Sequence, residues 1–234
     1  MAFDLGLERA GHECVGQCEI DPYALKVLEK HWPDVPRFGD ILAINPHKLP
    51  KSQLWTAGFP CQDISNAGKR KGIKGSRSGL FFWFMRMVRE VCPEYILLEN
   101  VSALLVRGMG EVLAELAGSG YDAEWRVLRA SDFGAPHQRE RVFIVAYRDG
   151  QRIEGGWKTP LSRQLGFSWC EGIRGVEDLQ NRPDLPEPLI RRITHGLGRR
   201  VDCCGNAVVP QVAEYIGRLL KQAELERKTG TDND

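Results

Sequence analysis

The sequence predicts an α/β fold in which buried strands alternate with amphipathic helices. Residues 95–98 form an uninterrupted apolar run, which is typical of a strand buried on both faces of a parallel sheet, and residues 141–147 predict a further strand. Residues 80–91 carry apolar side chains at helical spacing. This pattern ends before Pro93, and a proline disfavours the helical conformation of the residue that precedes it. This alternation of strands and helices indicates a doubly wound sheet.

The N-terminal elements follow the same alternation. Residues 3–11 predict a helix and residues 12–20 a strand. Asp21 is a favourable N-cap and the proline after it suits the first helical position, so a second helix is expected over 22–30. Residues 53–57 are short, apolar and followed by Gly and Pro, which is the pattern of a core strand at its carboxyl end.

Two further helices are expected in the second half of the chain. Residues 112–116 are apolar at helical spacing, and the glycines at 118 and 120 end that helix. The polar tail from residue 226 onward is expected to fray. The last helix follows Pro210 and places these apolar residues on one face: Val212, Ile216, Leu219 and Leu220.

Composition excludes several classes of protein. A chain of 234 residues that is 42% hydrophobic and 27% charged suits one substantial core with a small additional module. No apolar run approaches the roughly 20 residues of a membrane span, and no signal peptide is evident, so a cytoplasmic protein is expected. The seven cysteines are scattered without zinc-finger spacing, so neither a metal site nor a disulfide framework is expected.

One of these cysteines is a candidate nucleophile. Cys61 follows Pro60 at the expected carboxyl end of strand 53–57, the edge of an α/β sheet where ligands bind. A lone cysteine is more often a small buried hydrophobe, and that alternative stands for Cys61 by itself. Glu99 directly follows the apolar run 95–98, where burial raises a carboxyl pKa and suits it to proton donation, although it could instead belong to a helix N-cap.

Charge is clustered locally although the net charge is only +1. Residues 69–77 contain five cations, two glycines and no acid, which indicates a mobile cationic loop. Such a loop is either solvated surface or a clamp on a phosphate backbone. Its cations are Lys69, Arg70, Lys71, Lys74 and Arg77.

Two acids lie where strands of the sheet are expected to end. Glu19 closes segment 12–20, and Asp40 follows the helix expected over 22–30. In nucleotide-binding α/β folds an acid at such a strand end accepts hydrogen bonds from ribose, about 20 residues after a glycine-rich turn. Counting back from Glu19 reaches Met1, so the first strand and its turn are expected to be missing from this sequence. The alternative is that both acids are solvated surface residues.

Four motifs in order resemble those of the DNA cytosine-5 methyltransferase family. Residues 58–62, Gly-Phe-Pro-Cys-Gln, are similar to its nucleophile motif, and residues 99–101, Glu-Asn-Val, to its ENV motif. Residues 138–142 are similar to its QRxRV motif, and residues 205–210 to its late GNxVxP motif. The order of the four motifs makes the resemblance specific.

The resemblance implies a Rossmann-like sheet that uses S-adenosylmethionine to methylate cytosine C5 in double-stranded DNA. It further implies a compact phage- or prophage-like member. The sequence gives no oligomeric state, and action as a monomer is the default expectation. The expected domains are 1–146 for catalysis and cofactor binding, 147–200 as a small target-recognition insertion, 201–225 as a return to the first domain, and 226–234 as a disordered tail. Loss of the first strand is expected to weaken cofactor binding and stability.

The resemblance also implies roles for individual residues. Cys61 adds to C6 of a flipped-out cytosine, Glu99 contacts N3 and the exocyclic amine, and Arg141, supported by Arg139, binds the O2 side. Around the cofactor, Glu19 is expected on the ribose, Ile20 against the adenine, Asp40 on the adenine amine and Asn206 closing the site. The full set of cofactor-binding residues is Leu5, Glu19, Ile20, Asp40, Ile41, Pro60, Asn206 and Val208. The DNA-binding set is Gln62, Ser65, Lys69, Arg70, Lys71, Lys74 and Arg77.

Two other functions remain open from the sequence. A homologue impaired by its missing strand would bind DNA without methylating it. A cytosine methyltransferase of related fold could instead act on RNA.

Overall fold

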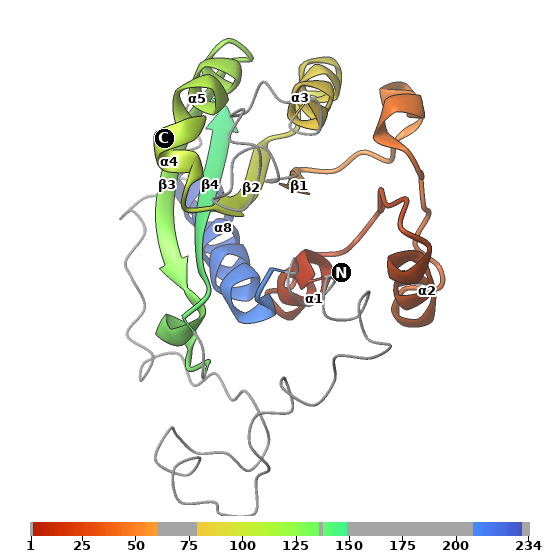
Figure 1. Ribbon diagram of the computed structural model, residues 1–234, viewed down its shortest axis with the longest axis horizontal. Helices are drawn as coiled ribbons and strands as arrows, with labels where there is room; N and C mark the ends of the chain where they lie inside the picture. Colours follow the sequence, from red (N-terminus) through yellow and green to blue (C-terminus); the bar gives the residue numbers. More distant parts are fainter. Residues whose placement is uncertain (1, 60–78, 136–137, 149–207, 231–234) are drawn as a thin grey trace, which may run out of the picture.

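The computed structural model describes residues 2–59, 79–135, 138–148 and 208–230. Its sheet has four strands in the order β1-β2-β4-β3 (Figure 1). β1 (Leu54–Gly58) runs parallel to β2 (Tyr95–Val101), while β4 (Glu140–Arg148) is antiparallel to both β2 and β3 (Tyr121–Arg129). The α/β class is therefore confirmed, with a mixed sheet in place of the expected parallel one.

Most of the expected helices are present. Asp21 caps α2 (Pro22–His31) by accepting hydrogen bonds from the backbone nitrogens of Tyr23 and Ala24, and α3 (Leu80–Val91) has the bounds that its apolar spacing predicts. Two short 3-10 helices, η1 (Ile41–Ala43) and η2 (Pro46–Lys48), precede β1, and η4 (Ala130–Phe133) follows β3. The α-helices are α1 (Ala2–Arg9), α2 (Pro22–His31), α3 (Leu80–Val91), α4 (Leu104–Arg107), α5 (Met109–Ala117) and α8 (Pro210–Gly230).

Strand β2 forms the centre of the core because both of its faces are covered. Ile96 and Leu98 pack in a cluster with residues of α3 and α5, whereas Tyr95 and Leu97 pack in a second cluster with residues of α8. Figure 1 shows α8 crossing behind β3 and β4, and α3 and α5 lying away from it. The uninterrupted apolar run of β2 thus reflects a strand between two helical layers.

Strand β3 is not evident in the sequence analysis. It lies at the sheet edge and is buried mainly at Tyr121 and Leu128, with exposed charged side chains such as Asp122 and Arg126 between them. An edge strand needs neither a continuous apolar run nor a strict alternation, because its unpaired edge is open to water, which forms hydrogen bonds with the backbone groups there. Its pairing with β4 along the whole of 121–129 supplies the hydrogen bonds that the sequence pattern does not reveal.

The prediction of a strand over residues 12–20 is wrong, and so is the prediction of a strand that ends at Asp40. The described residues contain one isolated parallel bridge there, Gln17 to Arg37, with hydrogen bonds from Gln17 N to Pro36 O at 3.0 Å and from Phe38 N to Gln17 O at 2.9 Å. A strand needs a ladder of partners, and pairing here stops where Gly39 turns the chain with φ +67°.

Helix α1 packs against α8 so closely that glycines are required on both sides. A Cβ on Gly6 would lie 2.6 Å from the Ala213 Cβ and 2.8 Å from the Glu214 backbone nitrogen. On α8, a Cβ on Gly217 would lie 2.8 Å from the Ala10 Cβ. The N-terminal helix is thereby attached to the C-terminal helix on one side of the sheet (Figure 1).

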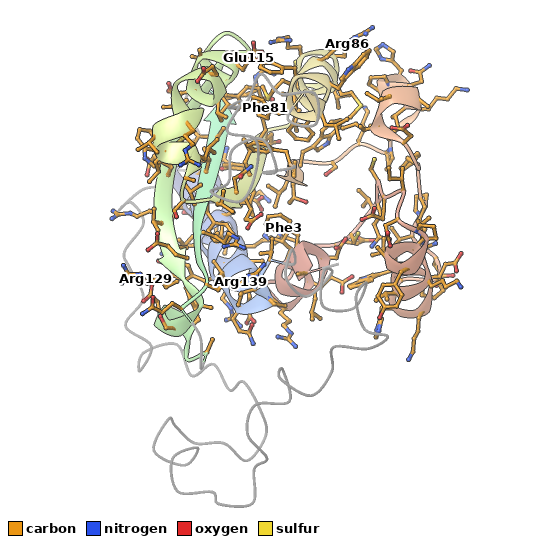
Figure 2. The ribbon with its side chains drawn as sticks, in the orientation of Figure 1. Phe3, Phe81, Arg86, Glu115, Arg129 and Arg139 are labelled. Carbon is orange, nitrogen blue, oxygen red and sulfur yellow. The ribbon has the colours of Figure 1, made fainter. Side chains whose placement is uncertain are left out.

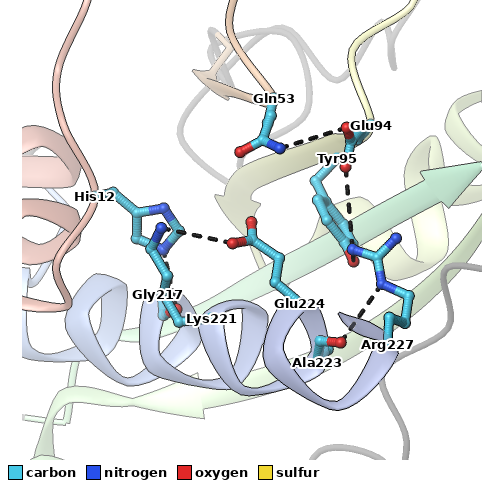
Figure 3. A network of polar contacts seen from close by, with 9 residues as sticks. All are labelled: His12, Gln53, Glu94, Tyr95, Gly217, Lys221, Ala223, Glu224 and Arg227. Atoms are coloured by element: carbon cyan, nitrogen blue, oxygen red, sulfur yellow. Dashed lines mark hydrogen bonds and ion pairs between the residues drawn. The ribbon is translucent and has the colours of Figure 1, made fainter. Parts of the chain in front are cut away.

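Polar contacts also join the C-terminal part of α8 to the residues at the start of β2 (Figure 3). Arg227 Nη2 donates to the Tyr95 hydroxyl at 2.6 Å and lies 4.0 Å from Glu94 Oε2. Gln53 Nε2 in turn donates to Glu94 Oε1 at 3.4 Å. Residues 226–230, which were expected to fray, are helical because these contacts hold the last turns of α8.

None of the helices formed by the described residues is both long and apolar enough to cross a membrane.

Replacing Gly6 by Ala tests the α1–α8 packing. We expect Gly6→Ala to lower the free energy of unfolding by about 1–3 kcal/mol, because the new methyl group meets backbone atoms that cannot move aside. Gly110→Ala is the matched control: this α5 glycine has nothing within 4 Å of its Cβ position, so the change should raise stability by up to about 1 kcal/mol. Urea denaturation measures both, and equal effects would contradict the close packing.

Candidate active site

Glu99 is a buried carboxylate near the carboxyl end of the central strand. It lies in register with Gly58 of β1, and its side chain is 9% exposed. Its Oε1 atom lies 3.0 Å from Arg141 Nε. Burial raises the pKa of Glu99, and the nearby charges of Arg141 and Arg139 only partly oppose that rise. The direction agrees with the prediction from sequence and gives a carboxyl group suited to sharing a proton.

The two arginines reach Glu99 from the antiparallel neighbour of β2. Arg141 pairs in register with Val101, and its Nη1 donates to the Glu140 carbonyl at 2.8 Å, which helps to orient the guanidinium. Arg139 precedes β4 with φ +32°, a conformation that side-chain-bearing residues rarely adopt. Figure 2 shows Arg139 at the end of the sheet where β4 begins. The fold thus gathers three residues that the sequence predicts as catalytic.

A second cluster brings the two acids of the N-terminal region together. The parallel bridge between Gln17 and Arg37 aligns segments 17–19 and 37–40. As a result, the charges of Glu19 and Asp40 both raise the pKa of the Cys18 thiol. Burial raises the pKa of Cys18 to about 11, with the charges of Glu19 and Asp40 as further causes. The Cys18 thiol donates to the Gly39 carbonyl at 3.0 Å. This thiol is therefore protonated at neutral pH and is a poor nucleophile.

The carboxylates of this cluster are oriented by backbone amides. Glu19 Oε1 accepts hydrogen bonds from Ile20 N at 2.8 Å and from Asp21 N at 2.9 Å. Asp40 Oδ1 accepts from Leu42 N at 3.0 Å. Each acid is consequently held in place at the start of a helix rather than swinging freely in solvent.

Exposed aliphatic side chains accompany these acids. Ile20 is 65% exposed, Leu42 is 49% exposed and Leu5 is 37% exposed. Ile41 is half-buried and packs against the core cluster beside α3. Acids next to accessible apolar surface suit a ligand with hydroxyl groups and a flat base. Leu42 is not among the residues predicted for the site, because only its exposure, not its residue type, sets it apart.

The remaining predicted site residues are either in the core or outside the described residues. Val208 is buried with Val209 in the cluster beneath α8. Among the described residues, no group of three or more His, Cys, Asp or Glu side chains could hold a metal ion. The predicted residues outside the described ranges are Pro60, Cys61, Gln62, Ser65, Lys69, Arg70, Lys71, Lys74, Arg77 and Asn206.

Comparison with known families and proteins gives consistent matches. A family model described as C-5 cytosine-specific DNA methylase matches residues 2–182. The type II methyltransferase M.HhaI of Haemophilus parahaemolyticus is 37% identical over 156 residues, covering 65% of this chain and 47% of that protein. The type II methyltransferase M2.BsuMI of Bacillus subtilis is 36% identical over 195 residues, covering 74% of this chain and 50% of that protein.

A solved structure shares the fold. The S. pombe Dnmt2 methyltransferase aligns with a TM-score of 0.53 and 21% sequence identity, covering 80% of this chain and 54% of that one. This chain spans about half the length of the two curated relatives named above.

The raised pKa of Glu99 predicts a pH-dependent stability. Between its ordinary value of 4.5 and the raised value, the folded protein binds more protons than the unfolded chain. The stability that this group contributes is therefore present below pH 4.5 and is lost as the pH rises through the folded-state pKa. Glu99→Gln cannot titrate, so we expect it to lose less stability than the wild type as the pH rises from 4.5 through the folded-state pKa of Glu99.

Urea denaturation across this pH range measures the effect. Glu140→Gln, which removes a more exposed carboxylate that pairs with Arg129 on the same sheet, is the control for the loss of a carboxylate. A Glu99→Gln profile parallel to that of the wild type would contradict a raised pKa at Glu99.

Proposed function

Because the chain belongs to the C-5 cytosine-specific DNA methylase family, we propose that it methylates C5 of cytosine in double-stranded DNA with S-adenosylmethionine as methyl donor. The observation that supports this most is the buried Glu99 carboxyl, held 3.0 Å from Arg141 beside the end of the strand that leads to Cys61. A flipped cytosine needs a proton donor at N3 and a cation near O2, and these two side chains supply both.

The reaction needs a nucleophile from the protein, because C5 of cytosine is itself a poor nucleophile towards a methyl donor. The Cys61 thiolate adds to C6, the C5–C6 π electrons move towards N3, and N3 takes a proton from Glu99. The ring then carries enamine-like electron density at C5. When bound, S-adenosylmethionine supplies the electrophilic methyl group that C5 attacks, and its sulfur keeps the electron pair of the broken S–C bond. Loss of the C5 proton to a base re-forms the C5–C6 double bond and expels the Cys61 thiolate. N3 returns its proton to Glu99, which leaves the neutral methylated base.

Residues of the N-terminal cluster would hold the donor. Glu19 would accept hydrogen bonds from the ribose hydroxyls, and Asp40 would accept from the adenine amine. The exposed side chain of Ile20 would pack on the adenine, with Leu5 and Ile41 as further apolar contacts. This assignment is supported by the parallel alignment that brings Glu19 and Asp40 to the same thiol. Pro60, Asn206 and Val208 complete the proposed set.

The DNA partner is proposed from chemistry and charge. C5 of a stacked cytosine is inaccessible, so the nucleotide must leave the duplex to reach Cys61. The cations of residues 69–77 would contact phosphates, since such contacts position DNA without reading its sequence. Residues 147–200 would carry target recognition.

Covalent trapping tests the proposed reaction. DNA containing 5-fluorocytosine should form a stable adduct with the protein in the presence of S-adenosylmethionine, because fluorine at C5 cannot leave as a proton. Cys61→Ser should abolish the adduct. Cys92→Ser is the matched control, since this exposed cysteine at the end of α3 should be dispensable.

The possible outcomes separate the candidate functions. An adduct on denaturing gels that requires Cys61 supports DNA methylation. DNA binding in gel-shift assays without any adduct would instead indicate a homologue that binds without methylating. An adduct with fluorocytosine-containing tRNA but not with DNA would indicate an RNA substrate.

The proposed cofactor contact of Glu19 has its own test. Glu19→Gln should weaken S-adenosylmethionine binding by about tenfold, since hydrogen bonds to a charged acceptor contribute roughly 1.5 kcal/mol. Glu13→Gln, a change of an exposed acid in the preceding segment, should leave the affinity unchanged. Isothermal titration calorimetry measures both, and equal affinities for the two variants would argue against Glu19 as a ribose ligand.

A further inference from the structure

We infer that Asn100 is a positioning residue: through the backbone carbonyl of Phe59 it sets the point from which the chain leaves β1 towards Cys61. This inference rests on the proposed function, in which Cys61 is the nucleophile and Glu99 acts on the same base. It assigns a role to a side chain that neither contacts the base nor forms an ion pair in the proposed reaction.

The parallel ladder between β1 and β2 ends just before this point. Its last registered pair is Gly58 with Glu99. The next carbonyl along the chain, that of Phe59 just after β1, accepts its hydrogen bond from the side chain of Asn100, with Nδ2 to O at 3.1 Å. The Asn100 side chain thus extends the link between the two strands by one residue beyond their backbone pairing.

Asn100 is itself held in a single orientation. It is 2% exposed, and its Oδ1 accepts a hydrogen bond from Val101 N at 2.9 Å. Exchanging the amide oxygen and nitrogen would set a donor against the Val101 N–H and an acceptor against the Phe59 carbonyl, so both hydrogen bonds would be lost. Its backbone pairs in register with Val142 of β4, which fixes the residue from the other side.

The Phe59 side chain is fixed as well. It is 7% exposed and its ring lies 4.9 Å from that of Phe81 on α3, centroid to centroid. With its ring packed and its carbonyl bonded, Phe59 is the last described residue before the segment that carries Cys61. The last described residue after β1 is therefore fixed through both its ring and its carbonyl.

The Glu99 side chain also lies beside the end of β1. A Cβ at Gly58 would lie 3.4 Å from Glu99 Oε2, so the carboxyl group directly adjoins the end of β1. Cys61 follows Phe59 by two residues, a separation that spans at most about 7 Å of chain. The position of Phe59 therefore limits where Cys61 can lie. Because a misplacement of about 1 Å can slow a reaction by about a hundredfold, Asn100 controls how the nucleophile and the Glu99 carboxyl are aligned.

The test compares Asn100→Asp and Asn100→Ala with Tyr121→Phe in the full chain. Asn100→Asp keeps the shape and the acceptor but loses the N–H donor. Tyr121→Phe is the matched control, because it also removes a buried hydrogen bond from a side chain to a backbone carbonyl, that of Pro93, at 2.5 Å, away from the proposed site. Thermal or urea unfolding shows how much stability each change costs.

We expect both Asn100 variants to slow single-turnover adduct formation on 5-fluorocytosine DNA by about 10- to 100-fold, while the dissociation constants for DNA and S-adenosylmethionine change less than about threefold. Tyr121→Phe should keep the wild-type rate in its folded fraction. Adduct rates that fall only in proportion to the unfolded fraction, in all three variants alike, would overturn the inference.

A second readout does not depend on methyl transfer. Alkylation of Cys61 by iodoacetamide, followed by peptide mass spectrometry with Cys92 as internal reference, should change at least fivefold in the Asn100 variants and not in Tyr121→Phe. If the wild type forms no adduct but this change in alkylation is seen, the proposed function fails while the role of Asn100 stands. Unchanged Cys61 alkylation together with unchanged adduct rates would exclude the positioning role.

Discussion

Burial of β2 on both faces is the constraint on which the rest of the structure depends. With α3 and α5 against one face and α8 against the other, every side chain from Tyr95 to Asn100 is removed from water. An apolar strand is stabilised by this environment, but a carboxylate in it is destabilised. Glu99 is consequently held with Arg141 and carries a raised pKa, so the chemistry of the candidate site follows from the packing of the core.

The close approach of α1 and α8 connects the two ends of the chain. Gly6 and Gly217 let the two helix backbones meet, and Arg227 ties the same helix to the start of β2. The segments after α1 are less regular, and one bridge at Gln17 is enough to align them. Glu19 and Asp40 thus lie on a lightly paired region anchored to the core by helix packing, whereas Glu99 and Arg141 lie on the central strands.

Local signals in the sequence predict some elements well and others poorly. The Asp21 cap, the helical spacing of α3 and the apolar run of β2 are each specified by neighbouring residues, and the structure confirms all three. The strand expected over 12–20 fails because a strand also needs partners, and β3 is missed because its partner β4 stabilises it without a strong apolar pattern.

By itself, the sequence determined the α/β class, the principal elements and the motif residues Cys61, Glu99, Arg139 and Arg141, since periodicity, capping and each motif are properties of short segments. Only the tertiary structure decided that β4 is antiparallel, that Glu99 meets Arg141, that Glu19 and Asp40 flank one thiol, and that Asn100 holds the Phe59 carbonyl. Those contacts join residues far apart in the chain, and their geometry depends on which surfaces pack together, which no local pattern specifies.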